Sequence, residues 1–146
     1  MDSLNKQNSL SHFIVGASRG IGRSLVDQSI QNGHRVTALS RTPPTEPIIG
    51  CNWITGNATE PEVFLDQLPE TINALTFCPG KVILGPVKRL KPEQMLEAYQ
   101  TSVLDAFTLI QALLPRLEGS VVFISSVAAT TGLPSHCAIS AAKSGL

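Results

Sequence analysis

Val15-Gly16-Ala17-Ser18-Arg19-Gly20-Ile21-Gly22 is the stretch that decides the fold of this 146-residue chain. The apolar run Phe13-Ile14-Val15 predicts a strand that leads into it, and apolar residues at helical spacing from Ile21 to Ile30 predict a helix that leads out. Glycine lets the backbone come close to a phosphate, and the following helix directs its N-terminal amides and positive dipole end there. The stretch therefore predicts a turn that binds a dinucleotide pyrophosphate.

The glycine spacing is Gly-x-x-x-Gly-x-Gly, over Gly16, Gly20 and Gly22, and not the commoner Gly-x-Gly-x-x-Gly. A glycine triplet alone is also compatible with a tight turn that binds nothing. The strand before it, the helix after it and a second strand at residues 36–39 favour the dinucleotide site over that alternative.

Composition sets the remaining bounds. With 42% hydrophobic residues and no net charge, the chain predicts one domain over residues 1–146, with residues 1–9 as a flexible arm. Scattered basic residues argue against a nucleic-acid partner, and no apolar run approaches the ~20 residues that span a membrane. The polar start is no secretory signal, and three cysteines without paired spacing indicate reduced thiols, so we expect a cytoplasmic protein.

Strand and helix signals alternate along the chain, which predicts a parallel sheet with right-handed helical crossovers. A loop with three prolines, residues 41–47, follows the second strand and is expected to lie exposed on the cofactor side. Glycine 119 is expected to end the longest helix. The predicted strands are residues 10–15, 36–39, 52–55, 74–78 and 121–125, and the predicted helices are 20–32, 60–68 with Thr59 as its cap, 92–117, and 138 onward.

Three segments resemble the short-chain dehydrogenases/reductases: the glycine loop, residues 121–126 and residues 138–143. The resemblance extends from about residue 13 to residue 146. It implies an α/β fold, a Rossmann-type doubly wound parallel sheet that is incomplete at its C-terminal side, and a nicotinamide cofactor at the carboxyl ends of the strands. The cofactor contacts that it implies are Gly16, Ser18, Arg19, Gly20, Ile21, Gly22, Asn57, Gly80 and Lys143. Asn57 stands where the resemblance places an adenine-contacting aspartate, and its amide oxygen is expected to accept from the adenine amine.

The residue after the second strand contacts the adenosine ribose in such sites. An acid there accepts from the 2′-hydroxyl of NAD, whereas an arginine suits the 2′-phosphate of NADP. This chain has Ser40-Arg41 and no acid, and Arg19 can reach the same region. Two guanidinium groups therefore predict a preference for NADP(H) over NAD(H), unless both are only solvated.

The resemblance also implies a catalytic set of serine, tyrosine, lysine and asparagine for hydride transfer to or from a carbonyl or alcohol substrate. Ser126 matches the serine and Lys143 matches the lysine, which also binds the nicotinamide ribose. The tyrosine position, four residues before Lys143, is Ile139, and the asparagine position is Ser102. Isoleucine has no proton to donate, and the loss of a general acid costs ~10²–10⁴ in rate.

Two neighbours are candidates to replace the missing acid. His136 lies before the helix and histidine titrates in a useful range, whereas Ser140 lies about 100° round the helix from Ile139 and should therefore point elsewhere. Another departure is in the fourth strand, which ends Phe77-Cys78-Pro79-Gly80, where the family usually has Asn-Asn-Ala-Gly. Phe77 cannot make the hydrogen bonds by which the first of those asparagines ties neighbouring strands together.

Family domains continue beyond the point where this sequence stops, at Leu146. We therefore expect the fifth strand to be an uncovered edge, so that the sequence is a piece of a longer protein or a partner covers that edge. Three functions remain open: an NADP(H)-dependent carbonyl reductase, a catalytically silent NADP(H)-binding regulatory module, and an oligomerisation module. A homo-oligomer is expected to form through helices 92–117 and 138–146.

Overall fold

The computed structural model describes residues 9–146, so the predicted arm of residues 1–9 lies, apart from Ser9, outside the described residues. The described residues form one parallel sheet with the strand order β3-β2-β1-β4-β5. This order places β1 in the middle, and all five of its residues are buried. The strands are β1 Ser11–Val15, β2 Arg35–Ser40, β3 Cys51–Thr55, β4 Ile72–Phe77 and β5 Leu117–Phe123.

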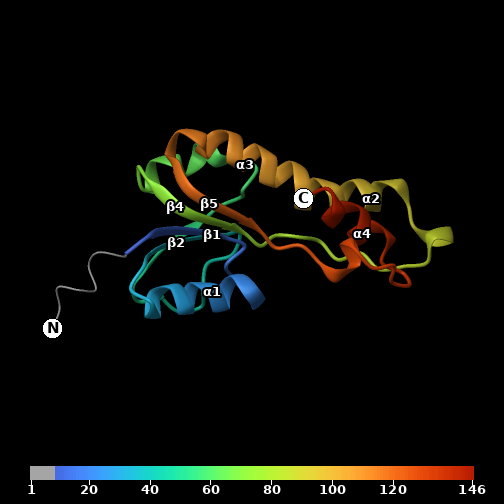
Figure 1. Cartoon of the computed structure of the whole chain (residues 1–146), viewed down its shortest axis with the longest axis horizontal. Helices are drawn as coiled ribbons and strands as arrows, with labels where there is room; N and C mark the ends of the chain where they lie inside the picture. The colour runs from blue at the N-terminus through green and yellow to red at the C-terminus, as the bar shows by residue number, and fades with distance from the viewer. Residues whose placement is uncertain (1–8) are drawn as a thin grey trace.

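Helices cover both faces of the sheet, which confirms the predicted doubly wound α/β class (Figure 1). Helix α1, Gly20–Gln31, lies on one face, and α3, Asp105–Leu113, lies on the other. Helices α2, Pro92–Tyr99, and α4, Cys137–Ser144, pack against each other beyond the carboxyl end of the sheet. The cofactor turn and the implied catalytic residues therefore belong to the same end of the molecule.

The core has two parts because the sheet is apolar on both faces. On the α3 face, side chains of alternate strand residues, such as Phe13 and Leu75, pack with Leu109 of the helix. On the α1 face, Ile14 and Ala38 pack with Val26. This alternation follows from the two-residue period of a strand and holds α1 and α3 in place.

Residues 60–68 do not form the predicted helix. They form two short 3₁₀ turns, Pro61–Val63 and Leu65–Gln67, and Thr59 does not cap either of them. The apolar side chains Phe64 and Leu68 are buried in the core, so packing and not helical propensity sets this backbone. No helix joins β2 to β3 either, where the predicted proline-rich loop lies.

The predicted single helix of residues 92–117 is also wrong in two respects. A π-helical turn, Gln100–Leu104, separates α2 from α3, and a 3₁₀ turn, Leu114–Arg116, ends the helical segment. Gly119 does not end the helix but lies inside β5, where a Cβ would be only 1.9 Å from the Asn73 carbonyl oxygen. Glycine is needed there because the β4 backbone approaches too closely for a side chain.

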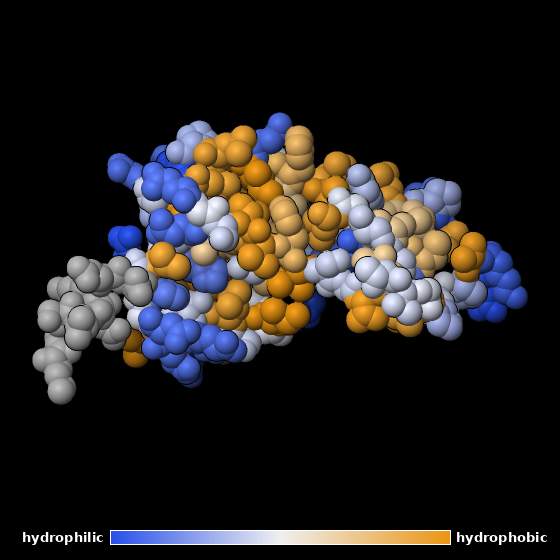
Figure 2. Space-filling view, viewed as in Figure 1, coloured by the Kyte–Doolittle hydropathy of each residue, from blue (hydrophilic) through white to orange (hydrophobic). Residues whose placement is uncertain are grey.

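Apolar residues lie on two faces of the helical segment that begins at Pro92. Ala98, Ala106 and Leu109 are buried against the domain. Figure 2 shows apolar side chains gathered over the part of the surface where Figure 1 shows β5 and α3. The exposed apolar residues of these elements and of α2 are Leu96, Tyr99, Phe107 and Val122, and Leu114 follows α3 directly. As predicted, β5 is an edge strand of the described sheet.

Within residues 9–146, no helix is long and apolar enough to cross a membrane.

Candidate functional site

The glycine turn is the best-defined part of the site. Gly16 has a φ of 79°, and the N–H groups of Gly16 and Ala17 donate to the Leu39 carbonyl at 2.9 and 3.2 Å. A Cβ on Gly22 would lie 2.4 Å from the carbonyl oxygen of Gly16, so only glycine lets α1 start this close to the strand end. The turn is thereby fixed between β1, β2 and the first turn of α1.

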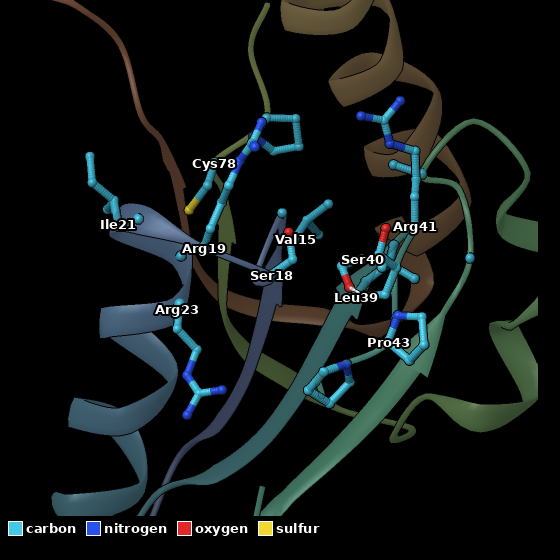
Figure 3. A pocket seen from close by; sticks show the side chains of 18 of the residues that line it. Val15, Ser18, Arg19, Ile21, Arg23, Leu39, Ser40, Arg41, Pro43 and Cys78 are labelled. Carbon is cyan, nitrogen blue, oxygen red and sulfur yellow. Dashed lines mark hydrogen bonds between the residues drawn. The ribbon is translucent and has the colours of Figure 1, made fainter. Parts of the chain in front are cut away.

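An open groove of about 1330 Å³ runs along the carboxyl ends of the strands above this turn (Figure 3). Its size suits a dinucleotide better than the 300–1,000 Å³ of an ordinary small-molecule pocket. Nine of the predicted cofactor residues line this one groove: Gly16, Ser18, Arg19, Gly20, Ile21, Gly22, Arg41, Asn57 and Gly80. Lys143 and Ser126 do not line it.

Two cations flank the groove. Figure 3 shows Arg19 beside the start of α1 and Arg41 beyond the end of β2, with both side chains extending outward past the strand ends. Both are exposed, and neither has a salt-bridge partner among residues 9–146, whereas Arg23 pairs with Asp27 at 3.1 Å. Two guanidinium groups are therefore available to an anionic ligand.

Asn57, at the implied adenine position, lies two residues after the end of β3. Its side-chain oxygen accepts a long hydrogen bond, 3.4 Å, from the backbone N–H of Thr59. The amide nitrogen has no partner in the described chain and remains available as a donor. The predicted hydrogen bond from the adenine amine would therefore have to share this oxygen with the Thr59 N–H.

Lys143 is buried, with 6% of its surface exposed. Its ammonium donates to the carbonyl oxygens of Pro79, at 2.9 Å, and Ile124, at 2.7 Å, which follow β4 and β5. Burial lowers the pKa of this ammonium, and the nearby Cys78 thiol opposes that change. Lys143 thus ties α4 to the two strand ends, beside the groove residue Gly80.

The other implied catalytic positions lie after β5, on α4 and in the π-helical turn. Ser126 is half-buried, and its hydroxyl oxygen accepts from the Ala128 N–H at 3.2 Å. Ile139 is buried at 4% exposure and offers no proton donor. Ser102 lies in the π-helical turn, is fully buried, and its hydroxyl has no hydrogen-bond partner in the described structure. A polar group without a partner at a π-helical turn is typical of a functional site.

Neither candidate replacement for the acid lines the groove. The His136 Nδ1 lies 2.6 Å from the carbonyl oxygen of Pro134, so this nitrogen carries the proton and donates it there. The structure therefore gives no support to rescue by either residue.

The proline-rich loop of residues 41–47, expected on the cofactor side, lines the groove; sequence analysis missed Arg23 and two polar residues of the helical segment, Thr101 and Asp105. The two side chains are four residues apart and so share one side of the helical segment. That spacing was a usable signal. Residues 92–117 were interpreted as an interface helix, so only their apolar positions were considered.

The parallel sheet, the glycine turn and the groove at the strand ends define a Rossmann-type dinucleotide-binding domain. The family model described as short chain dehydrogenase matches residues 62–146, more than half of the chain. The chain therefore belongs to the short-chain dehydrogenase family.

Curated relatives agree with this membership. The chain is 27% identical to carbonyl reductase family member 4 of Danio rerio over 91% of its own length, and 29% identical to a tropinone reductase homolog of Arabidopsis thaliana over 92%. An uncharacterized oxidoreductase of Myxococcus xanthus is 30% identical over 92%. The chain spans about three fifths of the length of these proteins, namely 63%, 58% and 60%.

Solved structures share the fold. A short-chain dehydrogenase from Streptomyces avermitilis superposes with a TM-score of 0.82 at 24% identity, over 94% of this chain and 56% of that one. A short chain dehydrogenase family protein from Francisella tularensis superposes with a TM-score of 0.81 at 20% identity, over 93% and 59%. At these identities the likeness shows the fold alone.

Gly22→Ala tests the close approach at the turn. The added Cβ would meet the Gly16 carbonyl oxygen at 2.4 Å, so we expect a loss of about 1–3 kcal/mol in unfolding free energy and weaker nucleotide binding. Urea unfolding and NADPH titration measure the two effects. Ser24→Ala, at an exposed position of α1, is the control. Unchanged stability and binding in Gly22→Ala would contradict the geometry.

Proposed function

We propose that this chain is an NADP(H)-binding oxidoreductase domain for a carbonyl or alcohol substrate. One observation carries the proposal: two guanidinium groups without partners in the described chain, Arg19 and Arg41, flank the groove above the glycine turn. A 2′-phosphate offers them charge-assisted hydrogen bonds that a 2′-hydroxyl cannot. The names of two relatives, which call them reductases, support the reaction class.

The residues present fit the cofactor at the pyrophosphate and ribose-phosphate ends. The N-terminal turn of α1 supplies the positive end of a helix dipole beside the glycine turn, and Arg19 and Arg41 supply positive charge. When bound, the nicotinamide group supplies hydride exchange. Ser126 would hold the substrate oxygen, and Lys143, whose ammonium has a third N–H donor beside the two that bind carbonyls, would contact the nicotinamide ribose.

A second candidate function is a catalytically silent NADP(H)-binding module. Ile139 favours it, because this buried apolar side chain stands where the family's proton donor is expected. Binding through the glycine turn and the arginines does not need that proton. Catalysis needs that proton. Cofactor binding can therefore persist in a chain that has lost the catalytic reaction.

We further propose that the chain forms a homo-oligomer in the cytoplasm. The exposed apolar residues Leu96, Tyr99 and Phe107 along α2 and α3 support a second copy as the partner, because exposed apolar residues gathered on one surface mark protein interaction sites. The free thiols of Cys51, Cys78 and Cys137 support a reducing compartment.

Arg41→Ala tests the cofactor preference. Removal of one guanidinium group should weaken NADPH binding about tenfold and leave NADH binding nearly unchanged, because only NADPH carries the 2′-phosphate. Nucleotide fluorescence titration measures both affinities. Arg35→Ala, at the opposite end of β2, is the matched control. Equal weakening of both nucleotides would contradict a phosphate contact.

Ile139→Tyr distinguishes the two functions. If only the proton donor is missing, the tyrosine should raise carbonyl reduction with NADPH by about 10²-fold over the wild type. Ser140→Tyr, which places the same side chain about 100° round the helix, should not. Absorbance of NADPH at saturating carbonyl substrate measures the rate, and thermal melting checks that each variant folds. An Ile139→Tyr variant that folds and binds NADPH yet stays inert would favour the silent module.

A further inference from the structure

We propose that Asp105 selects the base of the dinucleotide, accepting a hydrogen bond from the exocyclic amine of adenine. The inference rests on the proposed NADP(H) site and assigns a specificity-determining residue within it. It concerns the end of the groove distant from the reacting carbon. A base preference can therefore be measured by binding alone.

The location of Asp105 follows from its neighbours. It begins α3, directly after the π-helical turn, and it lines the groove together with Thr101 and Asn57. Ala106, the next residue, packs in the same core cluster as Ala58, the residue after Asn57. The helix also packs against the turn Pro61–Val63. Asp105 and Asn57 therefore both line the groove, on the side where α3 packs against the segment that follows β3.

The carboxylate of Asp105 has acceptor capacity to spare. One oxygen, Oδ1, accepts from the Gln100 side-chain amide at 2.9 Å, across the π-helical turn. Within residues 9–146, no lysine or arginine forms a salt bridge with it. A carboxylate offers about four lone-pair sites, so a half-buried one that faces a groove with a single partner is open to a ligand donor.

Asn57 supplies the complementary group. Its oxygen accepts from the Thr59 N–H, which leaves its amide nitrogen as a donor in the same groove that the Asp105 acceptor lines. Adenine presents an amine donor next to a ring-nitrogen acceptor, and that pattern matches an acceptor next to a donor. A 6-oxo purine reverses both groups, so it places its oxygen against the carboxylate. A site with a fixed hydrogen-bond pattern rejects such an analogue strongly because its polar groups lose their partners.

A purely structural role for Asp105 predicts something different. An acid in the first turn of a helix favours the helix dipole and stabilises the fold, whichever base is bound. Such an effect would change affinity for every nucleotide equally. The ratio of affinities for two bases therefore reports selection, and the absolute affinities do not.

The experiment compares NADP⁺ with nicotinamide hypoxanthine dinucleotide phosphate, which has a 6-oxo group in place of the adenine amine and a protonated ring nitrogen next to it. Calorimetric titration of the whole chain gives each affinity without requiring turnover. We expect the wild type to bind the hypoxanthine form about tenfold more weakly. Asp105→Asn should reduce that ratio to within about twofold, because a rotated amide can donate to the 6-oxo group. Asp66→Asn removes the same charge from an exposed turn outside the groove and should keep the wild-type ratio.

Two outcomes would overturn the inference. Equal binding of both forms by the wild type would show that no group reads the amine. A ratio that Asp105→Asn leaves unchanged would assign the selection to another residue. Both leave NADP(H) binding intact, whereas a folded wild-type chain that binds neither form contradicts the proposed function itself.

Discussion

The structure depends on how closely α1 approaches the end of β1. The Gly16 carbonyl oxygen lies 2.4 Å from the point that a Gly22 side chain would occupy, and the Gly16 and Ala17 amides are tied to the Leu39 carbonyl. This contact fixes the turn between two central strands and directs the start of α1 across the carboxyl edge of the sheet. The groove forms because α1 starts at this edge of the sheet and the loop after β2 leaves the edge toward the other side.

Much of this arrangement was readable from the sequence, because local pattern and long-range packing agree. The apolar run of β1 predicts a central strand, and the glycine spacing predicts the turn. Agreement fails at residues 60–68, where burial of Phe64 and Leu68 selects 3₁₀ turns. It fails again at Gly119. A glycine at this position predicts a helix end, but here it is needed because a neighbouring strand backbone leaves no room for a side chain. The carbonyl in question belongs to Asn73, 46 residues earlier, and no local pattern contains it.

The functional site likewise contains residues that local sequence pattern predicts and residues that it does not. Residues of the glycine turn and Arg41 were found by position relative to strand ends, which sequence predicts well. Lys143 matches a motif, but the sequence did not show that its ammonium is directed at two backbone carbonyls. Asp105 follows a π-helical turn that interrupts the predicted helix, and that turn helps set which side chains face the groove. Contacts between distant segments decide these details, and a single sequence does not record them.

Binding and catalysis therefore rest on different parts of the chain. The glycine turn, Arg19 and Arg41 belong to the first two β-strand units, whereas Ser126, Ile139 and Lys143 belong to the last described segments. The central claim is that the first part suffices to hold a phosphorylated dinucleotide. A titration of the purified 146-residue chain with NADPH and NADH, followed by nucleotide fluorescence and thermal stability together, tests it most directly. Saturable binding with tighter affinity for NADPH is the predicted result, and a folded chain that binds neither nucleotide would contradict the account.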